Sequence, residues 1–523
     1  MKNSLKYFFI TFLFLANSCS KDDNNENLSG NNSTVKTTII GRVFDESGSG
    51  LSGADVYIGN KTASTNLWGI YVIEDATVVK SRSIITVKKA GYWDQVGTFK
   101  PKSGGTSSSN LCLYTSTNTH SVNALLGGTI NTIDGASIQF PIDAFERMDG
   151  TSYTGTVALT VHHLPRSADL FSLKAPGTDF KGKSLSNTIE NLVSFGMIGA
   201  TLKDGSGNEL KLKTGKKAII SLPVHAAQLA IAPPSIPLWH FNDVTAIWEE
   251  EGTALFNGNM YTGEVSHFSW WNCDQPGGVD VGGLVINCNN NPLADAEIYA
   301  DGMWGSWSDL NGEWYGVLAP NMNTDLHAEY YDWNGNFYTT SIYTMLAQPN
   351  SSTFIVPDFV FPNANCYTLT GNVNKCDGQP SAATVLVILN NNLLAYQFTP
   401  TGAFDINVGN IGNVPIQIIA YKGIYTKALT TNYGTGTTLN IGTITLCDTT
   451  NLNNNVIMNF VSPVVGNIPI SLEVSSCIVN FISGKYEIVM AYTDSAVEIP
   501  PPLLSVHQCM LMELIIGIQQ TRV

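Results

Sequence analysis

The residues that best match a known chemical device form the octapeptide Gly177-Thr-Asp-Phe-Lys-Gly182-Lys183-Ser184. Its letters satisfy the phosphate-loop pattern, in which backbone N–H groups surround phosphates, the lysine reaches the outer phosphates and the serine hydroxyl binds Mg²⁺. A phosphate loop follows a buried parallel strand and opens a helix. Here Pro176 comes first, and the flanking segments are typical of an antiparallel sandwich. We therefore interpret the octapeptide as a surface loop and not as a nucleotide site.

A second candidate is the adjacent pair His162 and His163, because imidazole is the commonest metal ligand in proteins. Neighbouring side chains on a strand point to opposite faces, so this pair cannot chelate one ion. The sequence contains no HExxH, no calcium-loop spacing and no GxSxG. These absences remove the commonest hydrolase routes. We predict structural roles for both histidines, no metal site and no cofactor.

Composition indicates that β-structure must position any functional side chain. Charged residues make up 13% of the chain and aromatic residues 10%, and the Leu, Ala, Glu and Lys richness of helical proteins is missing. A chain of 523 residues also exceeds what one core organises, so several domains are expected. The net charge of -15 argues against nucleic acid, whose phosphates require clustered Lys and Arg. We predict an all-β chain of tandem transthyretin-like or Ig-like β-sandwich modules in an elongated arrangement.

The N-terminus has the layout of a signal peptide. Two lysines precede an apolar run over residues 7–16 that is too short to span a bilayer. Small residues flank Asn17 just before Cys19, and this resembles a lipobox, although Asn17 departs from the usual pattern. The resemblance implies that residues 1–19 are a lipoprotein signal peptide and that Cys19 carries the acyl chains. Ordinary secretion, with Cys19 incidental, is the alternative.

The residues after Cys19 suggest where in the cell the protein is located. Lys21, Asp22 and Asp23 resemble the export signal of surface lipoproteins of the Bacteroidetes type. The resemblance implies a protein held in the outer membrane by its lipid and exposed on the cell surface. The polar, Asn-rich residues 20–36 bury little apolar area and are predicted to form a disordered tether.

Three segments share one pattern of strand, turn, alternating strand, turn and strand. They open with Gly41-Arg-Val43, Gly283-Leu-Val285 and Gly371-Asn-Val373, and they close with Gly69-Ile-Tyr71, Gly312-Glu-Trp314 and Gly402-Ala-Phe404. The pattern resembles the carboxypeptidase regulatory-like domain, a small transthyretin-like β-sandwich, over residues 37–115, 280–366 and 367–448. In that family the module carries no catalytic group, which implies a spacer, a stabiliser or an interaction surface.

Eight cysteines remain after Cys19, in a compartment where disulfides persist. No CxxC pair has metal-binding spacing. Cys288 and Cys366 lie near the two ends of the second module, and Cys376 and Cys447 near the ends of the third. Pairing within each module is the economical interpretation, although the sequence does not determine connectivity.

Residues 116–274 differ from the three repeats. Motifs such as Gly127-Gly128-Thr129-Ile130, Ser194-Phe195-Gly196-Met197-Ile198 and Pro237-Leu238-Trp239-His-Phe241 resemble the extracellular β-sandwich region of cartilage intermediate layer protein. That region is distantly akin to sandwiches of netrin receptors and ankyrins. Residues 449–523 are predicted to form a partial or atypical module, whose apolar end is either a truncated sequence or a strand that caps an open edge.

The stretch His267-Phe268-Ser269 closes this larger domain. In the resembled family and its relatives such a tripeptide can be a self-cleavage site. The resemblance implies attack of the Ser269 hydroxyl on the Phe268 carbonyl carbon, an N-to-O acyl shift and hydrolysis of the ester, with His267 as general base. The alternative is a relaxed strand with aromatic residues on both faces, Trp271 beside His267 and Ser269 on one face and Phe268 and Trp270 on the other. We favour the strand.

These features favour a non-enzymatic surface lipoprotein that displays β-sandwich modules as an adhesin or scaffold, for an unidentified extracellular protein or glycan. A glycan-binding role in nutrient capture is the first alternative, because aromatic rings stack on sugars. Its candidates are Trp304, Trp307 and Trp333, near Trp314, Tyr330 and Tyr331. Self-cleavage between Phe268 and Ser269 is the second alternative.

Overall fold

The computed structural model describes residues 33–301, 303–332, 335–363, 367–408, 414–423, 425–432 and 438–447, and the backbone of four further strands between residues 455 and 516. The described chain is all-β, as predicted, apart from one turn of α-helix and one 3-10 turn. None of its helices is long and apolar enough to cross a membrane. Cys19 and the export signal from Lys21 to Asp23 lie outside the described residues and stay predictions.

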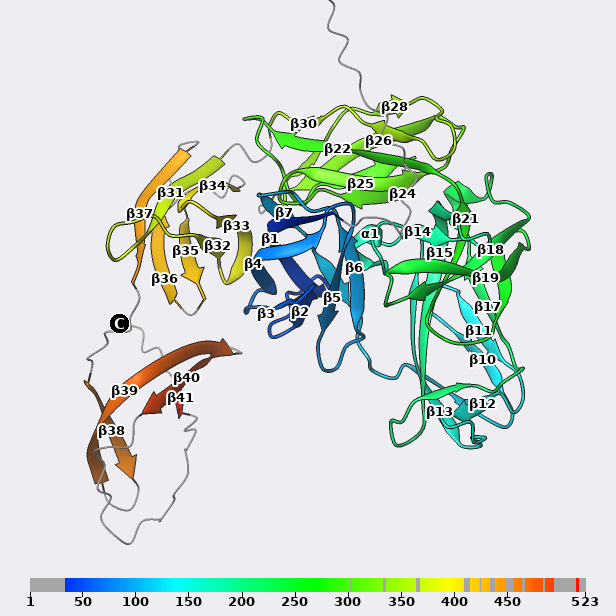
Figure 1. The fold of residues 1–523 in the computed structure, drawn as a ribbon, viewed down its shortest axis with the longest axis horizontal. Helices are drawn as coiled ribbons and strands as arrows, with labels where there is room; N and C mark the ends of the chain where they lie inside the picture. The colour runs from blue at the N-terminus through cyan, green and yellow to red at the C-terminus, as the bar shows by residue number, and fades with distance from the viewer. Residues whose placement is uncertain are drawn as a thin grey trace, which may run out of the picture. The chain divides into compact units, whose positions relative to one another are not determined.

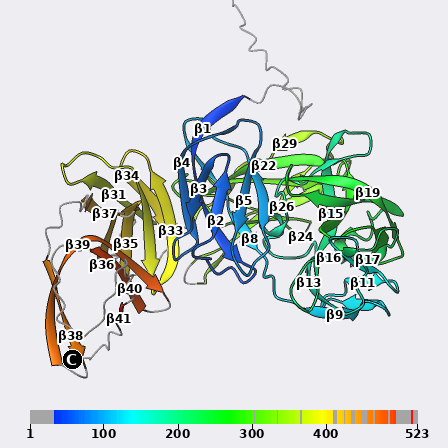
Figure 2. The ribbon, with the colours of Figure 1, turned by 60° about the horizontal axis from the view of Figure 1, so that its bottom comes forward.

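The first repeat forms two sheets around one core (Figures 1 and 2). One sheet has the order β4-β1-β7, with β8 also paired to β1, and the other has the order β3-β2-β5-β6. The strands are β1 (Thr34–Asp45), β2 (Asp55–Ile58), β3 (Lys61–Ser64), β4 (Ile70–Val79), β5 (Ser83–Lys88), β6 (Gln95–Phe99), β7 (Thr106–Ser108) and β8 (Leu111–Leu113). The central strand β1 is antiparallel to β4 and parallel to β7 and β8.

The second and third repeats have the same arrangement of a central strand, an antiparallel neighbour and a parallel neighbour. Their sheets have the orders β25-β22-β29 with β30 on β22, β24-β23-β26-β27 with β28 on β26, β34-β31-β37, and β33-β32-β35-β36. The strands are β22 (Val279–Asn287), β23 (Glu297–Ala300), β24 (Met303–Trp307), β25 (Glu313–Leu318), β26 (Thr324–Tyr331), β27 (Phe337–Thr339), β28 (Tyr343–Met345), β29 (Thr353–Ile355), β30 (Phe359–Phe361), β31 (Tyr367–Lys375), β32 (Ala383–Leu389), β33 (Asn392–Thr399), β34 (Ala403–Val408), β35 (Pro415–Lys422), β36 (Tyr425–Asn432) and β37 (Thr438–Leu446).

A glycine shared by the three repeats explains why the sequence pattern recurs. The pairs concerned are Gly69 with Val43, Gly312 with Val285, and Gly402 with Val373. In each, the valine N–H donates to the glycine carbonyl at 2.7 to 2.8 Å, and the glycine φ lies between 71° and 83°. A Cβ on the glycine would lie only 2.2 to 2.5 Å from the valine carbonyl oxygen. No other residue fits there, so the glycine is required by this turn.

The segment between the first and second repeats forms a larger sheet, in the order β10-β11-β17-β20-β19-β18-β21-β15-β13-β9 with β14 beside β15 and β19 (Figure 1). Its strands are β9 (His120–Asn123), β10 (Gly128–Asn131), β11 (Ser137–Phe140), β13 (Thr156–Leu164), β14 (Lys181–Lys183), β15 (Ile189–Lys203), β17 (Ala218–Pro223), β18 (Ser235–Asn242), β19 (Ile247–Phe256), β20 (Met260–Val265) and β21 (Trp270–Pro276). A bridge between Asn123 and Gly127 joins β9 to the start of β10, so the sheet curls back on itself around one core. A second sheet pairs β12 (Phe145–Arg147) with β16 (Leu210–Leu212), and the short helices are α1 (Phe171–Lys174) and η1 (Ala226–Gln228).

Alternate residues of these strands face the core of the larger domain. On β21, Trp271 and Cys273 belong to the core, whereas Trp270 joins a second apolar cluster. On β18, Leu238 belongs to the core and Trp239 to the second cluster. Large side chains therefore pack on both faces of these strands, and each fully buried one contributes roughly 1.5–3 kcal/mol.

The C-terminal strands form a fourth group, described here for its backbone alone. The antiparallel order is β38-β39-β40-β41, with β38 (Asn455–Ser462), β39 (Gly466–Ile482), β40 (Lys485–Tyr492) and β41 (Leu514–Ile516). Part of the apolar end of the chain thus pairs as a strand with β40.

Candidate functional site

The segment Ser266–Ser269 is a bend between β20 and β21, and the favoured prediction of a strand was wrong. The reason is visible in the packing. Phe268 and Trp271 both pack with the core of the larger domain, although residues three apart on one strand would face opposite sides. Sheet order requires the bend, because β19 and β18 lie between β20 and β21. The connection from β20 to β21 must therefore pass both of these strands.

The hydrogen bonds of the bend do not assemble a self-cleaving site. The Ser269 hydroxyl donates to the carbonyl oxygen of Trp270 at 3.1 Å, the residue that follows it. His267 Nε2 lies 3.2 Å from Glu251 Oε2. None of residues 266–269 has the positive φ that would mark backbone strain. Self-cleavage stays a prediction, and these contacts do not favour it.

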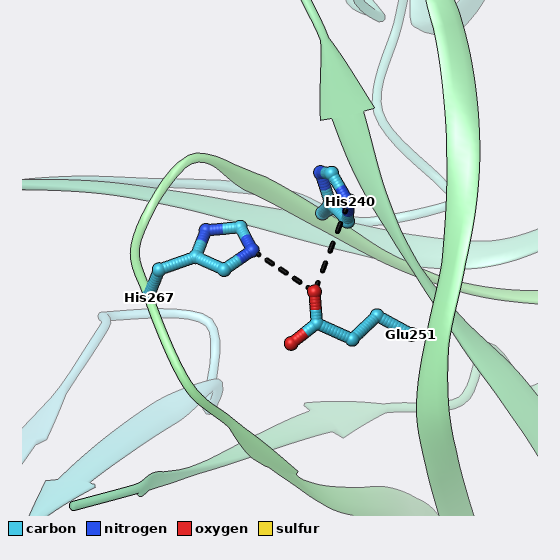
Figure 3. A group of neighbouring side chains, drawn as sticks. All are labelled: His240, Glu251 and His267. Atoms are coloured by element: carbon cyan, nitrogen blue, oxygen red, sulfur yellow. Dashed lines mark hydrogen bonds and ion pairs between the residues drawn. The ribbon is translucent and has the colours of Figure 1, made fainter. Parts of the chain in front are cut away.

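The bend instead brings His267 to two residues that the sequence did not single out (Figure 3). His240 lies on β18 and Glu251 on β19, and both side chains point towards His267. His267 Nε2 is 3.2 Å from Glu251 Oε2, and His240 Nε2 is 3.8 Å from the same oxygen. The exposed fractions of the side chains are 19% for His240, 41% for Glu251 and 38% for His267, so the cluster is half-buried with one open side.

Neighbouring groups hold this cluster in place. The Ser266 hydroxyl donates to Oε1 of Glu251 at 2.6 Å, and the indole N–H of Trp271 donates to the carbonyl of His267 at 3.0 Å. The Trp271 ring lies 4.9 Å from the His267 ring and 5.7 Å from the His240 ring, measured between centroids. Because Trp271 is fully buried, it gives the two imidazoles a rigid apolar support.

Electrostatics keeps Glu251 ionised. Burial acts to raise the pKa of Glu251, but the hydrogen bond from Ser266 and the charges of His267 and His240 outweigh it and lower the pKa. Burial lowers the pKa of His240, and the positive charge of His267 acts in the same direction, against Glu251 and Glu249. The cluster therefore combines a carboxylate with an imidazole that is neutral around pH 7.

The adjacent histidines point in different directions, as predicted. His162 Nε2 bonds to the carbonyl of Thr115 at 2.8 Å, and its Nδ1 lies 3.1 Å from Glu46 Oε1. His163 Nδ1 lies 2.8 Å from Asp134 Oδ2. The two rings share no partner among these contacts, which fits structural roles for both.

The phosphate-loop pattern is not built as a phosphate loop. Lys183 lies on β14, where a phosphate loop needs a helix, so the interpretation against a nucleotide site is confirmed. The octapeptide is not a free surface loop, however, because Gly177 is buried against the first repeat. Its N–H donates to the carbonyl of Val96 at 2.9 Å and its carbonyl accepts from the Thr98 hydroxyl at 2.6 Å.

The cysteines of the third repeat pair as the sequence predicts. Cys376 and Cys447 form a disulfide across 71 residues. Cys288 is also disulfide-bonded, and its predicted partner Cys366 lies outside the described residues. Cys112 and Cys273 are buried free thiols.

The predicted glycan-stacking residues are only partly described. Trp307 is half-buried, donates to Asp295 Oδ1 at 3.0 Å and packs against the second apolar cluster of the larger domain. The side chain of Trp304 and all of Trp333 lie outside the described part of the chain. Tyr331 and Phe337 are 60% and 49% exposed, with ring centroids 5.0 Å apart. These two rings are more exposed than that of Trp307.

Comparison with known proteins assigns no family. No protein-family model matches the chain, and no curated protein is similar to it. A likeness to the Bacillus anthracis TIE protein has 11% identity and a TM-score of 0.14 over 62% of this chain and 50% of that one. The shaft pilin SpaA from Lactobacillus rhamnosus GG matches at 9% identity and a TM-score of 0.18, over 32% of this chain and 97% of that one. The Bacillus cereus major pilin subunit BcpA matches at 7% identity and a TM-score of 0.13, over 79% and 99%. TM-scores this low do not support an inference about function, so the function has to be inferred from the residues of this chain.

Proposed function

We propose that this protein is a non-enzymatic lipoprotein of the outer membrane that displays its β-sandwich modules on the cell surface as an adhesin or scaffold. The observation that carries the proposal is the threefold repetition of one sandwich arrangement, with the same glycine turn and the same central strand each time. Repetition of a module with a packed core adds length and surface without adding a reaction site. The partner is an extracellular protein or glycan.

The N-terminal residues support the membrane part of this proposal. A lipoprotein signal peptide directs acylation of the Cys19 thiol, and Lys21, Asp22 and Asp23 act as the export signal. Several acyl chains on one residue anchor a protein stably, because each buried methylene contributes about 0.8 kcal/mol. The predicted tether then separates the first module from the lipid, although it ends before residue 36 because β1 begins at Thr34.

Anchoring and display are tested separately in a Gram-negative host that exports surface lipoproteins. We expect the full-length chain to incorporate labelled palmitate and the Cys19→Ser variant to lose the label. Proteinase K added to intact cells should degrade the wild-type chain. A variant with alanine at Lys21, Asp22 and Asp23 should keep the label but resist the protease. Label on Cys19→Ser would overturn lipidation at that thiol, and protection of the wild type would overturn surface display.

A glycan-binding role is the second candidate, and the exposed pair of Tyr331 and Phe337 favours it. Two aromatic rings side by side offer the apolar faces on which sugars stack. A glycan array probed with the full chain should give hits, and Tyr331→Ala should reduce them at least tenfold. Trp314 is not a suitable position for a comparison variant, because it is buried and its loss would unfold the module. An array without hits would count against this candidate and leave protein partners.

A further inference from the structure

Three potential metal ligands meet where the β20–β21 bend passes the strands β18 and β19. One ring nitrogen each of His240 and His267 and one carboxylate oxygen of Glu251 all lie within 4.8 Å of one another. Two imidazoles and one carboxylate with an open side match the ligand sets that hold Zn²⁺ and similar ions in proteins. We propose that His240, Glu251 and His267 bind one divalent transition-metal ion of the Zn²⁺ class.

The spacing of the three ligand atoms suits such an ion. In a tetrahedral zinc site with bonds of about 2.0–2.1 Å, the ligand atoms lie about 3.3 Å apart. The separations here are 3.2 Å from His267 Nε2 to Glu251 Oε2 and 3.8 Å from His240 Nε2 to the same oxygen. The ligand nitrogens of the two imidazoles lie within 4.8 Å of each other, and the set closes around an ion if the rings rotate to bring the ligand atoms nearer. Ca²⁺ and Mg²⁺ fit poorly, because both prefer ligand sets made of oxygen atoms.

An ion pair alone explains the arrangement less well. It satisfies His267, whose Nε2 lies within hydrogen-bonding distance of Glu251. His240 Nε2 is 3.8 Å from the nearest oxygens of both Glu251 and Glu249, which is too far for a hydrogen bond. Both imidazoles nevertheless direct the same nitrogen at one carboxylate oxygen (Figure 3). A shared ion accounts for that convergence.

The second layer of contacts is the kind that orients metal ligands. The Ser266 hydroxyl occupies Oε1 of Glu251 and leaves Oε2 for the ion. The Trp271 indole N–H bonds the backbone carbonyl of His267, and its ring packs against both imidazoles. Such outer contacts raise affinity by restricting ligand motion before the ion arrives. Water, or the Glu249 carboxylate, completes the coordination.

An ion can reach the cluster from solvent. A cavity of about 370 Å³ opens beside the bend and includes Ser266 and His267 in its wall. Four lysines also line this cavity. Lys211, Lys213 and Lys217 form ion pairs with Glu146, Asp143 and Glu264, and Lys216 donates to the carbonyl of Ile142. The ion would tie the bend to β18 and β19, which already pair with each other at His240 and Glu249.

The test uses the full mature chain with any affinity tag removed and with ZnCl2 as the probe. Isothermal titration should show one ion bound per chain. The thermal unfolding midpoint of the larger domain should rise with ZnCl2 and return with EDTA. At a free zinc concentration ten times the dissociation constant, the folding equilibrium should shift about elevenfold. Co²⁺ in place of zinc should give visible absorption bands of a tetrahedral site.

Matched variants decide whether this cluster is the site. Glu251→Gln and His267→Gln should each weaken zinc binding at least tenfold, while circular dichroism without metal stays that of the wild type. His327→Gln is the control, because His327 is also half-buried and lies 3.2 Å from Glu329 in another module. It should bind zinc as the wild type does. The proposal is overturned if the wild type binds no zinc and gives no Co²⁺ bands, or if Glu251→Gln and His267→Gln bind as tightly as the wild type.

Discussion

Asp274 on β21 gives the sharpest prediction for the larger domain. The residue is fully buried, and burial raises the pKa of its carboxyl to about 8. Hydrogen bonds from Ser194, the Phe195 backbone and Asn272, together with the charge of Arg166, act in the opposite direction. The folded domain therefore holds a proton on Asp274 that the unfolded chain, with an aspartate pKa of about 3.9, releases.

The sign follows from this difference in bound protons. Between about pH 4 and 8 the folded state holds one proton more than the unfolded state, so stability falls as the pH rises. The slope is at most about 1.4 kcal/mol per pH unit, or about 2.7 kcal/mol from pH 5 to pH 7. Asp274→Asn cannot titrate and resembles the protonated acid in shape. The stability of this variant relative to the wild type should therefore increase with pH by that slope.

The free energy of unfolding can be measured by urea unfolding followed by tryptophan fluorescence, because several tryptophans of the larger domain are buried. The difference between Asp274→Asn and wild type should be determined at pH 5, 6 and 7. His163 and His240 have lowered pKa values, so their contribution makes stability rise with pH. This contribution is common to variant and wild type and cancels when the difference between them is taken. Asp143→Asn is the control, since the pKa of Asp143 is lowered and its difference from wild type should stay flat. A flat difference for Asp274→Asn would mean that Asp274 is ionised and paired with Arg166 throughout.

Three further predictions concern a contact between two modules, the disulfide of the third repeat and the integrity of the chain at Ser269. Arg82→Ala should cost about 1–3 kcal/mol and expose the junction between the first repeat and the larger domain to proteases, because Arg82 binds Asp179 through two nitrogens. Arg82→Lys, which keeps the charge but not the fork, should lose most of the same stability. Reduction of the Cys376–Cys447 disulfide should cost the third repeat about 2–5 kcal/mol, seen as a lower unfolding midpoint that Cys376→Ser reproduces. The denatured chain should have a single intact mass, because the Ser269 hydroxyl is bonded to the following carbonyl; two fragments that Ser269→Ala abolishes would contradict this.

The repeats were predictable because their signals are local. Each repeat has a tight turn that only glycine fits, next to a buried valine, so the same residue types recur in the sequence, as at Gly69 with Val43. Period-two alternation then indicates strands without reference to distant residues. The pairing of Cys376 with Cys447 could be proposed for the same reason, since both flank one such module.

The bend and its cluster were not predictable from local patterns. No Gly, Pro, Asn or Asp interrupts residues 265–271, so the local sequence indicates a strand even though the chain turns there and Phe268 packs against the core. His240 and Glu251 lie 27 and 16 residues before His267, with no motif between them. Only the order β20-β19-β18-β21 brings the three together, and that order depends on pairings across the whole sheet.

The same sheet order suggests why chemistry gathers at this point of the chain. The β20–β21 connection has to pass two strands, so its side chains come to lie beside residues of β18 and β19 that alternate towards them. Two contacts hold this crossing in place. The Trp271 indole N–H donates to the His267 carbonyl, and the Glu251 carboxylate contacts the His267 ring. An ion held there would stabilise the crossing itself, which makes a structural role for the proposed metal the simplest one consistent with the proposed display function.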